Sequence, residues 1–208
     1  SLVGSEMCIR DSGNGAHLVM NKIMRYHSVD IEWGNHDVIW MGAASGSKLS
    51  ICNVLRNSAK YNLLDTLEEG YGINLLPLAQ LSLKYYGDDP CDIFNPESAS
   101  LIDIDKTMLV AKMHKAISII QFKLEKSLSD RNPNFKLDDR LLLDKVNYSN
   151  GTIELNGSVH KLRDNVFPTV DPEHPFQLIQ DEINVLNQLK RSFLNCDLLQ
   201  SHIKYMFT

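Results

Sequence analysis

The sequence has no uninterrupted apolar run that approaches the roughly 18–20 residues needed to span a bilayer, so no membrane span is expected. It also has no excess of positive charge, because 21 Lys and Arg residues stand against 26 Asp and Glu residues and give a net charge of −5. A nucleic-acid-binding protein needs a basic surface that replaces phosphate counterions, so the charge argues against that class. Of the 208 residues, 43% are apolar and 23% are charged, which is typical of one globular domain or two small ones.

Cysteine is scarce and widely spaced. Cys8, Cys52, Cys91 and Cys196 form no CxxC pair and no zinc-binding spacing. The sequence also shows no secretory signal peptide. Together these observations predict four reduced cysteines in a cytoplasmic protein.

Several common site motifs are missing. Residues 42–48 resemble a phosphate-binding P-loop, but Ser47 stands directly before Lys48, where that motif needs glycine. There is no HExxH zinc motif, no GxSxG nucleophile elbow and no complete dinucleotide-binding GxGxxG. The sequence therefore gives no support to the chemistries that these motifs carry.

The two ends of the chain differ from the rest. Residues 1–12, SLVGSEMCIRDS, follow neither a helical nor a strand period, and we interpret them as a non-native tail. Residues 205–208 stop in the middle of a helical pattern without a capping residue. Both ends suggest a piece of a longer protein.

Helical spacing of apolar residues dominates the remaining sequence and predicts a mainly α fold with a few strands. We expect more than half of the residues in helices, one of which opens at Val38. The other expected helices cover residues 15–27, 48–61, 62–69, 75–86, 106–128, 138–146, 177–194 and 197–207.

Two segments show strand character instead. Residues 29–33 alternate between apolar and polar side chains, and residues 152–162 flank Asn156-Gly157, which predicts a type I′ hairpin. A lone strand cannot form a sheet, so the partners of residues 29–33 are expected outside this chain or in an unexpected pairing. We therefore divide the chain into residues 13–47, a piece of an α/β core, and residues 48–208, a helical region with one hairpin.

Residues 85–105 contain six carboxylates and neither Lys nor Arg. The pattern of an EF-hand calcium loop is absent, so we interpret the segment as a solvated acidic loop. The carboxylates are Asp88, Asp89, Asp92, Glu97, Asp103 and Asp105.

The main chemical signal is Gly34-Asn35-His36-Asp37, between the predicted strand and a helix. Loops at the carboxyl ends of strands are where α/β folds place ligands. The Asn35 amide oxygen can bind a divalent cation, and His36 can donate a proton or stabilise charge on a leaving oxygen. Asp37 can orient the imidazole. On these four residues alone, a simple turn with Asp37 as the N-cap of the helix is an equal alternative.

The flanks of the motif extend this signal. Residues 29–47, VDIEWGNHDVIWMGAASGS, closely resemble the class III fructose-1,6-bisphosphatases of bacteria, which belong to the calcineurin-like metallophosphoesterase superfamily. The likeness covers residues 13–208. It includes Arg56, YNLLDTLE at 61–68, GYGIN at 70–74, YGDDPC at 86–91, AKMHKAI at 111–117, IQFKLE at 120–125, DRLLLDK at 139–145 and FPTVDP at 167–172.

The resemblance implies a two-metal phosphatase, typically manganese-dependent, whose parent core is an α/β metallophosphoesterase sandwich with a large helical insertion. In that superfamily two ions activate a hydroxide for in-line attack on phosphorus. Asn35 then matches a metal ligand, His36 the imidazole that assists the leaving sugar alkoxide, and Asp37 a supporting residue. The implied reaction is hydrolysis of the 1-phosphate of fructose 1,6-bisphosphate in gluconeogenesis. The implied protein is cytoplasmic, binds neither nucleic acid nor membrane, and is compatible with a homo-oligomer.

The sequence departs from the family upstream of residue 13. The Asp-x-His block is absent, and the GDxxDRG block stands as MCIRDSG at residues 7–13. Cys8 and Ser12 replace the metal-bridging Asp and the phosphate-binding Arg, while Asp11 matches the carboxylate that orients His36. The family's downstream histidine ligands would fall beyond residue 208, so we expect little or no activity from these 208 residues alone. The other histidines match no ligand position and are expected in helices, the hairpin or the surface: His17, His27, His114, His160, His174 and His202.

Two alternative functions stay open. The first is a metallophosphoesterase that acts on another phosphoester, because no substrate-contacting residue is identified. The second is a helical interaction or regulatory module without catalysis, because the chain lacks most of the metal ligands.

Overall fold

The computed structural model describes residues 15–26, 30–97 and 104–207. Helices make up 61% of it, and a small three-stranded sheet accounts for the strands, which confirms a mainly α fold. The predicted tail at residues 1–12 lies outside the described part, and the division of the chain at residue 47 stays a prediction. None of the described helices combines the length and the apolar character that a membrane span needs.

Helix α5 (Ile104–Arg131) lies at the centre of the fold, with α3 (Lys48–Lys60) and α4 (Leu76–Tyr86) packed against it. Apolar side chains in its middle are buried, since Ala116, Ile117 and Ile120 are each no more than 1% exposed. Burial of such side chains is the main stabilising contribution, about 1.5–3 kcal/mol for each large one.

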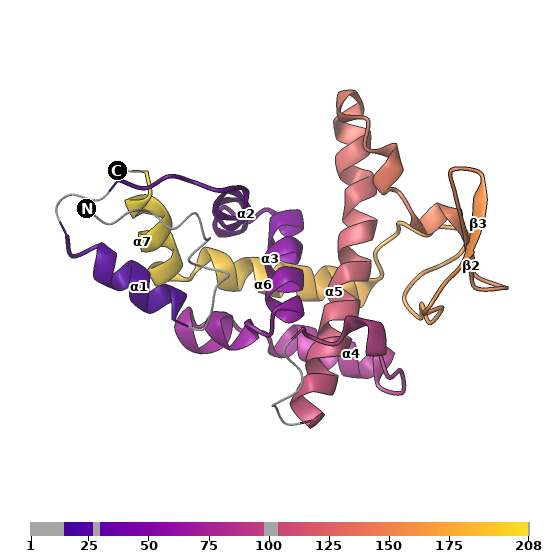
Figure 1. Cartoon of the computed structure of the whole chain (residues 1–208), viewed down its shortest axis with the longest axis horizontal. Coiled ribbons are helices and arrows are strands. Elements are labelled where there is room, and N and C mark those ends of the chain that lie inside the picture. Colours follow the sequence, from indigo (N-terminus) through magenta and orange to yellow (C-terminus); the bar gives the residue numbers. More distant parts are fainter. Residues whose placement is uncertain (1–14, 27–29, 98–103, 208) are drawn as a thin grey trace.

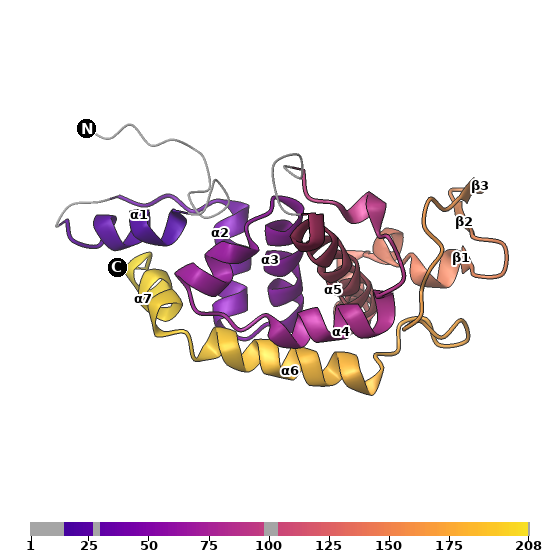
Figure 2. The ribbon, with the colours of Figure 1, turned by 90° about the horizontal axis from the view of Figure 1, so that it is seen from below.

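Helix α6 (Gln180–Leu194) runs beneath α2, α3 and α4 along the length of the molecule (Figure 2). At its start, Glu182 accepts a hydrogen bond from the Ile179 amide at 3.0 Å. This bond satisfies a backbone N–H group that has no acceptor within the helix. At one end of α6, helix α2 (Asn35–Ala44), helix α7 (Asp197–Tyr205) and helix α1 (Ala16–Ile23) complete the body (Figure 1).

The sheet lies at the opposite end of the molecule from α1 and α7 (Figure 1). Strands β1 (Val146–Asn147), β2 (Thr152–Leu155) and β3 (Ser158–Lys161) are antiparallel and ordered β1-β2-β3. Asn156 and Gly157 both have positive φ, 51° and 76°, as a type I′ turn requires. The predicted hairpin is therefore confirmed, with β1 as an additional strand.

Replacing Gly157 by alanine is expected to lower the free energy of unfolding by roughly 1 kcal/mol. A Cβ at this position meets nothing within 4 Å, so the loss comes from the left-handed backbone alone. Ser158→Ala, at the exposed residue directly after the turn, is the control, because it lies in the extended strand β3. Urea unfolding of both variants measures the difference, and equal stabilities contradict the expectation.

The predicted strand at residues 29–33 is wrong for the part that the structure describes, residues 30–33, which form neither strand nor helix. Among the described residues the strands all lie between residues 146 and 161, in a sheet at the opposite end of the molecule (Figure 1). Instead the indole Nε1 of Trp33 donates to the Met206 carbonyl at 3.0 Å, and its ring contacts Phe207. Side-chain contacts with the C-terminal residues therefore hold the segment.

The predicted helix at residues 138–146 is also wrong. Two short 3₁₀ turns, η6 (Asp138–Arg140) and η7 (Leu143–Lys145), flank an extended Leu141. Val146 then pairs with Ile153 in the sheet, and this pairing prevents a continuous helix. Two further 3₁₀ turns are η3 (Asp92–Phe94) and η5 (Pro133–Phe135).

The predicted helix at residues 62–69 is present only in part. Residues 64–65 are α-helical and continue into a π-helical turn, η2 (Thr66–Gly70), so Gly70 lies within the turn instead of ending it. A Cβ on Gly70 would lie 2.6 Å from His17 Nδ1, so glycine permits the close approach of α1.

Lys115 of α5 is completely buried in an ion cluster. Its ammonium group contacts Asp89 and lies 2.6 Å from Asp164 Oδ2. The expectation of a solvated acidic loop is therefore wrong at Asp89, whose side chain is 7% exposed. Burial favours a higher pKa for Asp89, but the hydrogen bonds from Lys115 and from the Cys91 amide, together with the charge of Lys115, outweigh it and hold the pKa below its ordinary value.

Two further lysines of α5 fasten it to its neighbours. Lys112 donates to carbonyl oxygens of residues 86, 87 and 89, at the C-terminal end of α4 and just beyond it. Lys123 lies 2.8 Å from Glu182 of α6 and donates to the Thr169 carbonyl. Residues 110–125 of α5 are all buried or half-buried, and these lysines link them to the neighbouring elements.

Three of the four cysteines, Cys52, Cys91 and Cys196, are buried and free, in agreement with the expectation of reduced thiols. Burial raises the pKa of all three, that of Cys91 to about 12, so they stay protonated at neutral pH. Cys8 lies outside the described residues.

Candidate functional site

The motif residues Asn35, His36 and Asp37 form the first turn of α2. Gly34 precedes the helix with an extended backbone, and its amide donates to Asp37 Oδ2 at 3.0 Å. Gly34 is therefore the N-cap, and Asp37, the third residue of the helix, accepts the hydrogen bond from its amide. The alternative of a simple turn with Asp37 as the N-cap is therefore wrong, and the expected start of the helix at Val38 is three residues too late.

Asn35 is exposed at the tip of α2. Its Oδ1 accepts a hydrogen bond from the His36 amide at 3.0 Å. An amide oxygen has two lone pairs, so this oxygen can accept the local bond and contact a ligand in solvent as well.

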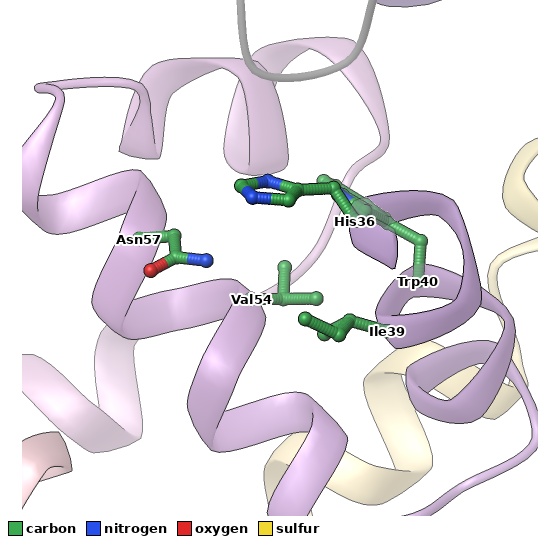
Figure 3. A pocket seen from close by; sticks show the side chains of 5 residues that line it. All are labelled: His36, Ile39, Trp40, Val54 and Asn57. Carbon is green, nitrogen blue, oxygen red and sulfur yellow. The ribbon is translucent and has the colours of Figure 1, made fainter. Parts of the chain in front are cut away.

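His36 lies over a small pocket between α2 and α3 (Figure 3). Ile39 and Trp40 come from the same helix, and Val54 and Asn57 come from α3. The half-buried imidazole and the Asn57 amide border the pocket, with apolar side chains beneath them (Figure 3).

Asn57 was not predicted as a site residue, and no residue of α3 was assigned a role. Its only sequence signal is the spacing from Val54, which puts both on one face of α3. That signal becomes informative only when the packing of α3 against α2 is known.

The described residues contain no group of three or more His, Cys, Asp or Glu side chains that could hold a metal ion. Asp11, which matches a carboxylate of the family, lies outside the described part. The donor set that remains is one neutral amide oxygen on Asn35. By themselves, therefore, the described residues do not fit a two-metal manganese site, which needs several ligands at once.

The other described histidines have structural surroundings, as expected. His202 is buried between the Tyr71 hydroxyl at 3.2 Å and Asn21 Oδ1 at 2.9 Å. His114 contacts the Phe94 carbonyl, and burial lowers its pKa. His17 packs in α1 against the ring of Tyr71, and two histidines, His160 and His174, are exposed. His27 lies outside the described residues.

Replacing Asp37 by alanine is expected to lower the free energy of unfolding by about 1 kcal/mol, because the Gly34 amide loses its acceptor. Glu32→Ala, two residues before the cap, is the matched control and should stay within roughly 0.5 kcal/mol of the parent. Thermal and urea unfolding of the 208-residue chain compare the two. If the Asp37 variant is as stable as the Glu32 variant, Asp37 does not stabilise the start of the helix.

A family model and individual relatives both match this chain, and they point to the same family. The model of the family described as Firmicute fructose-1,6-bisphosphatase matches residues 5–208. The chain is 51% identical over 201 residues to the class 3 fructose-1,6-bisphosphatase of Clostridium novyi (strain NT) and 53% identical over 201 residues to that of Clostridium tetani (strain Massachusetts / E88). Each match covers 96% of this chain and 30% of the relative.

The chain therefore spans less than a third of the length of these relatives. No solved structure matches it. The family model covers nearly every residue, including the turn that carries Asn35, His36 and Asp37. The chain belongs to the Firmicute fructose-1,6-bisphosphatase family.

Proposed function

We propose that the full-length protein to which this chain corresponds hydrolyses the 1-phosphate of fructose 1,6-bisphosphate, a step of gluconeogenesis. The observation that carries the proposal is the family match over residues 5–208, supported by relatives that bear this name. The remainder of the protein is expected to form the α/β metallophosphoesterase sandwich.

Within this reaction His36 holds a proton for the oxygen of the departing sugar. His36 lies in the first turn of α2, where the positive end of the helix dipole would stabilise negative charge on the same leaving oxygen. Asp37 supports His36 by fixing the turn. Asn57 borders the same pocket as His36.

Asn35 is proposed as one ligand of a divalent cation, with manganese as the expected metal. When bound, the metal would supply a Lewis acid for the phosphoryl oxygens. The described residues offer this ion a single donor, so the other ligands are expected from the remaining part of the protein.

The test is a full-length chimera in which residues 13–208 of this chain replace the corresponding part of the Clostridium novyi relative. Residues 1–12 are omitted so that the relative's own upstream segment is kept. With manganese, the chimera is expected to release phosphate from fructose 1,6-bisphosphate, and the isolated 208-residue chain is expected to release little or none.

A phosphoester panel tests the two alternatives with the same proteins. If the chimera hydrolyses another phosphoester faster, that compound and not the sugar bisphosphate is the substrate. A folded chimera that hydrolyses no phosphoester would favour the non-catalytic helical module, an alternative that the missing metal cluster among the described residues supports.

A further inference from the structure

Tyr71 is buried where four elements of the fold meet. It directly follows the π-helical turn η2, and its amide donates to the Thr66 carbonyl at 3.2 Å, which closes that turn. Helices α1, α2 and α7 pack against its ring through His17, Trp40 and His202. π-Helical turns are rare and are frequent at functional sites. Tyr71 therefore joins the first and last described helices to α2, the helix that carries the candidate site.

A hydrogen-bond network holds Tyr71 from the side of α7. The imidazole Nε2 of His202 lies 2.9 Å from Asn21 Oδ1, which can only accept, so in the neutral ring Nε2 carries the proton and Nδ1 is the acceptor. The Tyr71 hydroxyl therefore donates to Nδ1, at 3.2 Å. The thiol of Cys196, the N-cap of α7, donates to the Tyr71 carbonyl at 3.0 Å. A buried polar network with satisfied groups fixes one arrangement of the core, so α7 determines where Tyr71 lies.

Trp40 connects Tyr71 with the candidate site. The rings of Trp40 and Tyr71 lie 5.6 Å apart, and Trp40 is 3% exposed. Trp40 follows His36 by one turn of α2, and both side chains line the pocket between α2 and α3 (Figure 3). A second bond joins α7 to α2, because Gln200 Nε2 donates at 2.8 Å to the carbonyl of Ala44, the last residue of α2. Helix α2 is therefore held against α7 both through Tyr71 and at its C-terminal end.

We infer that Tyr71 is a positioning residue for His36, and that α7 fixes the place of the imidazole through Tyr71 and Trp40. A reacting group must be held within about 0.5 Å of its productive position by side chains that packing and hydrogen bonds fix in turn. Tyr71 meets both conditions, since its ring packs on Trp40 and its hydroxyl bonds to His202. The inference rests on the proposed role of His36, but the hold of α7 on α2 can be measured without activity.

The kinetics of the chimera test this role. Tyr71→Phe removes only the hydroxyl that bonds to His202. It is expected to lower kcat about tenfold and to leave KM and bound manganese nearly unchanged, because a small displacement of a reacting group slows the chemical step. Tyr86→Phe is the matched control and should leave kcat nearly unchanged. Tyr86 is also buried, and its hydroxyl lies 3.3 Å from that of Thr169, which belongs to neither α2 nor α7.

The same substitution in the His36→Ala chimera separates positioning from a general loss of structure. If Tyr71 acts through His36, Tyr71→Phe no longer lowers kcat once the imidazole is absent, because the effects of coupled residues do not add. An equal loss of kcat with and without the imidazole would overturn the inference. So would an unchanged kcat when Tyr71→Phe is made in an active chimera. Neither result bears on the proposed reaction, which the unsubstituted chimera tests by itself.

Hydrogen exchange in the 208-residue chain decides the inference if the unsubstituted chimera is inactive. Without the bond from His202, α2 should open more readily, so the amides of residues 40–44 are expected to exchange roughly tenfold faster in Tyr71→Phe. Gln200→Ala, which removes the other bond to α2, should also speed exchange at these amides. A general loss of stability would act alike in Tyr86→Phe. Equal exchange of residues 40–44 in Tyr71→Phe and Tyr86→Phe would therefore overturn the inference.

Discussion

Replacing Lys115 by methionine is expected to lower the free energy of unfolding by about 3–5 kcal/mol. Lys115 is fully buried, and its ammonium group is the cation that Asp89 and Asp164 share. Without it, two carboxylates at most 10% exposed are left in a low-dielectric interior, where an unpaired charge is costly. Urea unfolding at neutral pH measures the loss.

Lys84→Met is the matched control, because Lys84 also lies 2.7 Å from a carboxylate, Asp181, but its side chain is 64% exposed. Water screens that pair, so little change is expected. A triple variant, Lys115→Met, Asp89→Asn, Asp164→Asn, identifies the cause. If it regains much of the stability, the loss comes from the two unpaired carboxylates. A loss as small as that of the control would mean that the cluster does not stabilise the fold.

The loss should also depend on pH. In the parent, the pKa of Asp89 is held below its unfolded value, so its stabilising contribution is present above that unfolded value and is lost as the pH falls. In the variant, burial without Lys115 leaves the folded pKa raised, so proton uptake stabilises the folded state as the pH falls. Both effects reduce the difference between parent and variant from neutral pH to about pH 4.

In the active chimera, His36→Ala is expected to lower kcat by ~10²–10⁴-fold and to leave the bound manganese nearly unchanged. The imidazole lies in the first turn of α2 beside the pocket, where it is proposed to supply the proton of the leaving oxygen. Asn35→Ala is expected to weaken manganese binding instead, because it removes a proposed ligand oxygen. Metal analysis and kcat over a range of manganese concentrations measure both variants.

The two residues are neighbours in one helical turn and serve as controls for each other. Excess manganese should partly rescue Asn35→Ala and should not rescue His36→Ala. A turn with only a structural role would give two similar losses of stability and no such difference. Full activity in the His36 variant, or equal metal loss in both, would mean that these roles are wrong.

Most helices were predictable because burial on one face imposes a periodic pattern. The helix expected at residues 48–61 is observed as Lys48–Lys60, and the one expected at residues 75–86 as Leu76–Tyr86. The predictions that are wrong concern segments whose conformation depends on contacts with distant parts of the chain. Val146 leaves its predicted helix to pair with Ile153, and Trp33 bonds to a carbonyl at the far end of the chain instead of joining a ladder.

The candidate site was predictable only as far as the local sequence reaches. The motif was expected between a strand and a helix that opens at Val38, but Asn35, His36 and Asp37 form the first turn of that helix and Gly34 is its N-cap. Their catalytic roles stay predictions. Asn57 was missed because its relation to His36 depends on helix packing. Asp89 was misread because a run of carboxylates does not show that one of them faces a lysine 26 residues later.

The bonds that join the two ends of the described chain have a consequence for synthesis. Trp33 and Met206, Asn21 and His202, and Ile23 and Tyr205 are 173, 181 and 182 positions apart. At a translation rate of roughly 5–20 residues per second, α1 leaves the ribosome roughly 10–40 s before its partners in α7 exist. Until then α1 can pack only against earlier elements such as Gly70 and Tyr71, so a nascent chain stalled before α7 would lack all three of these bonds.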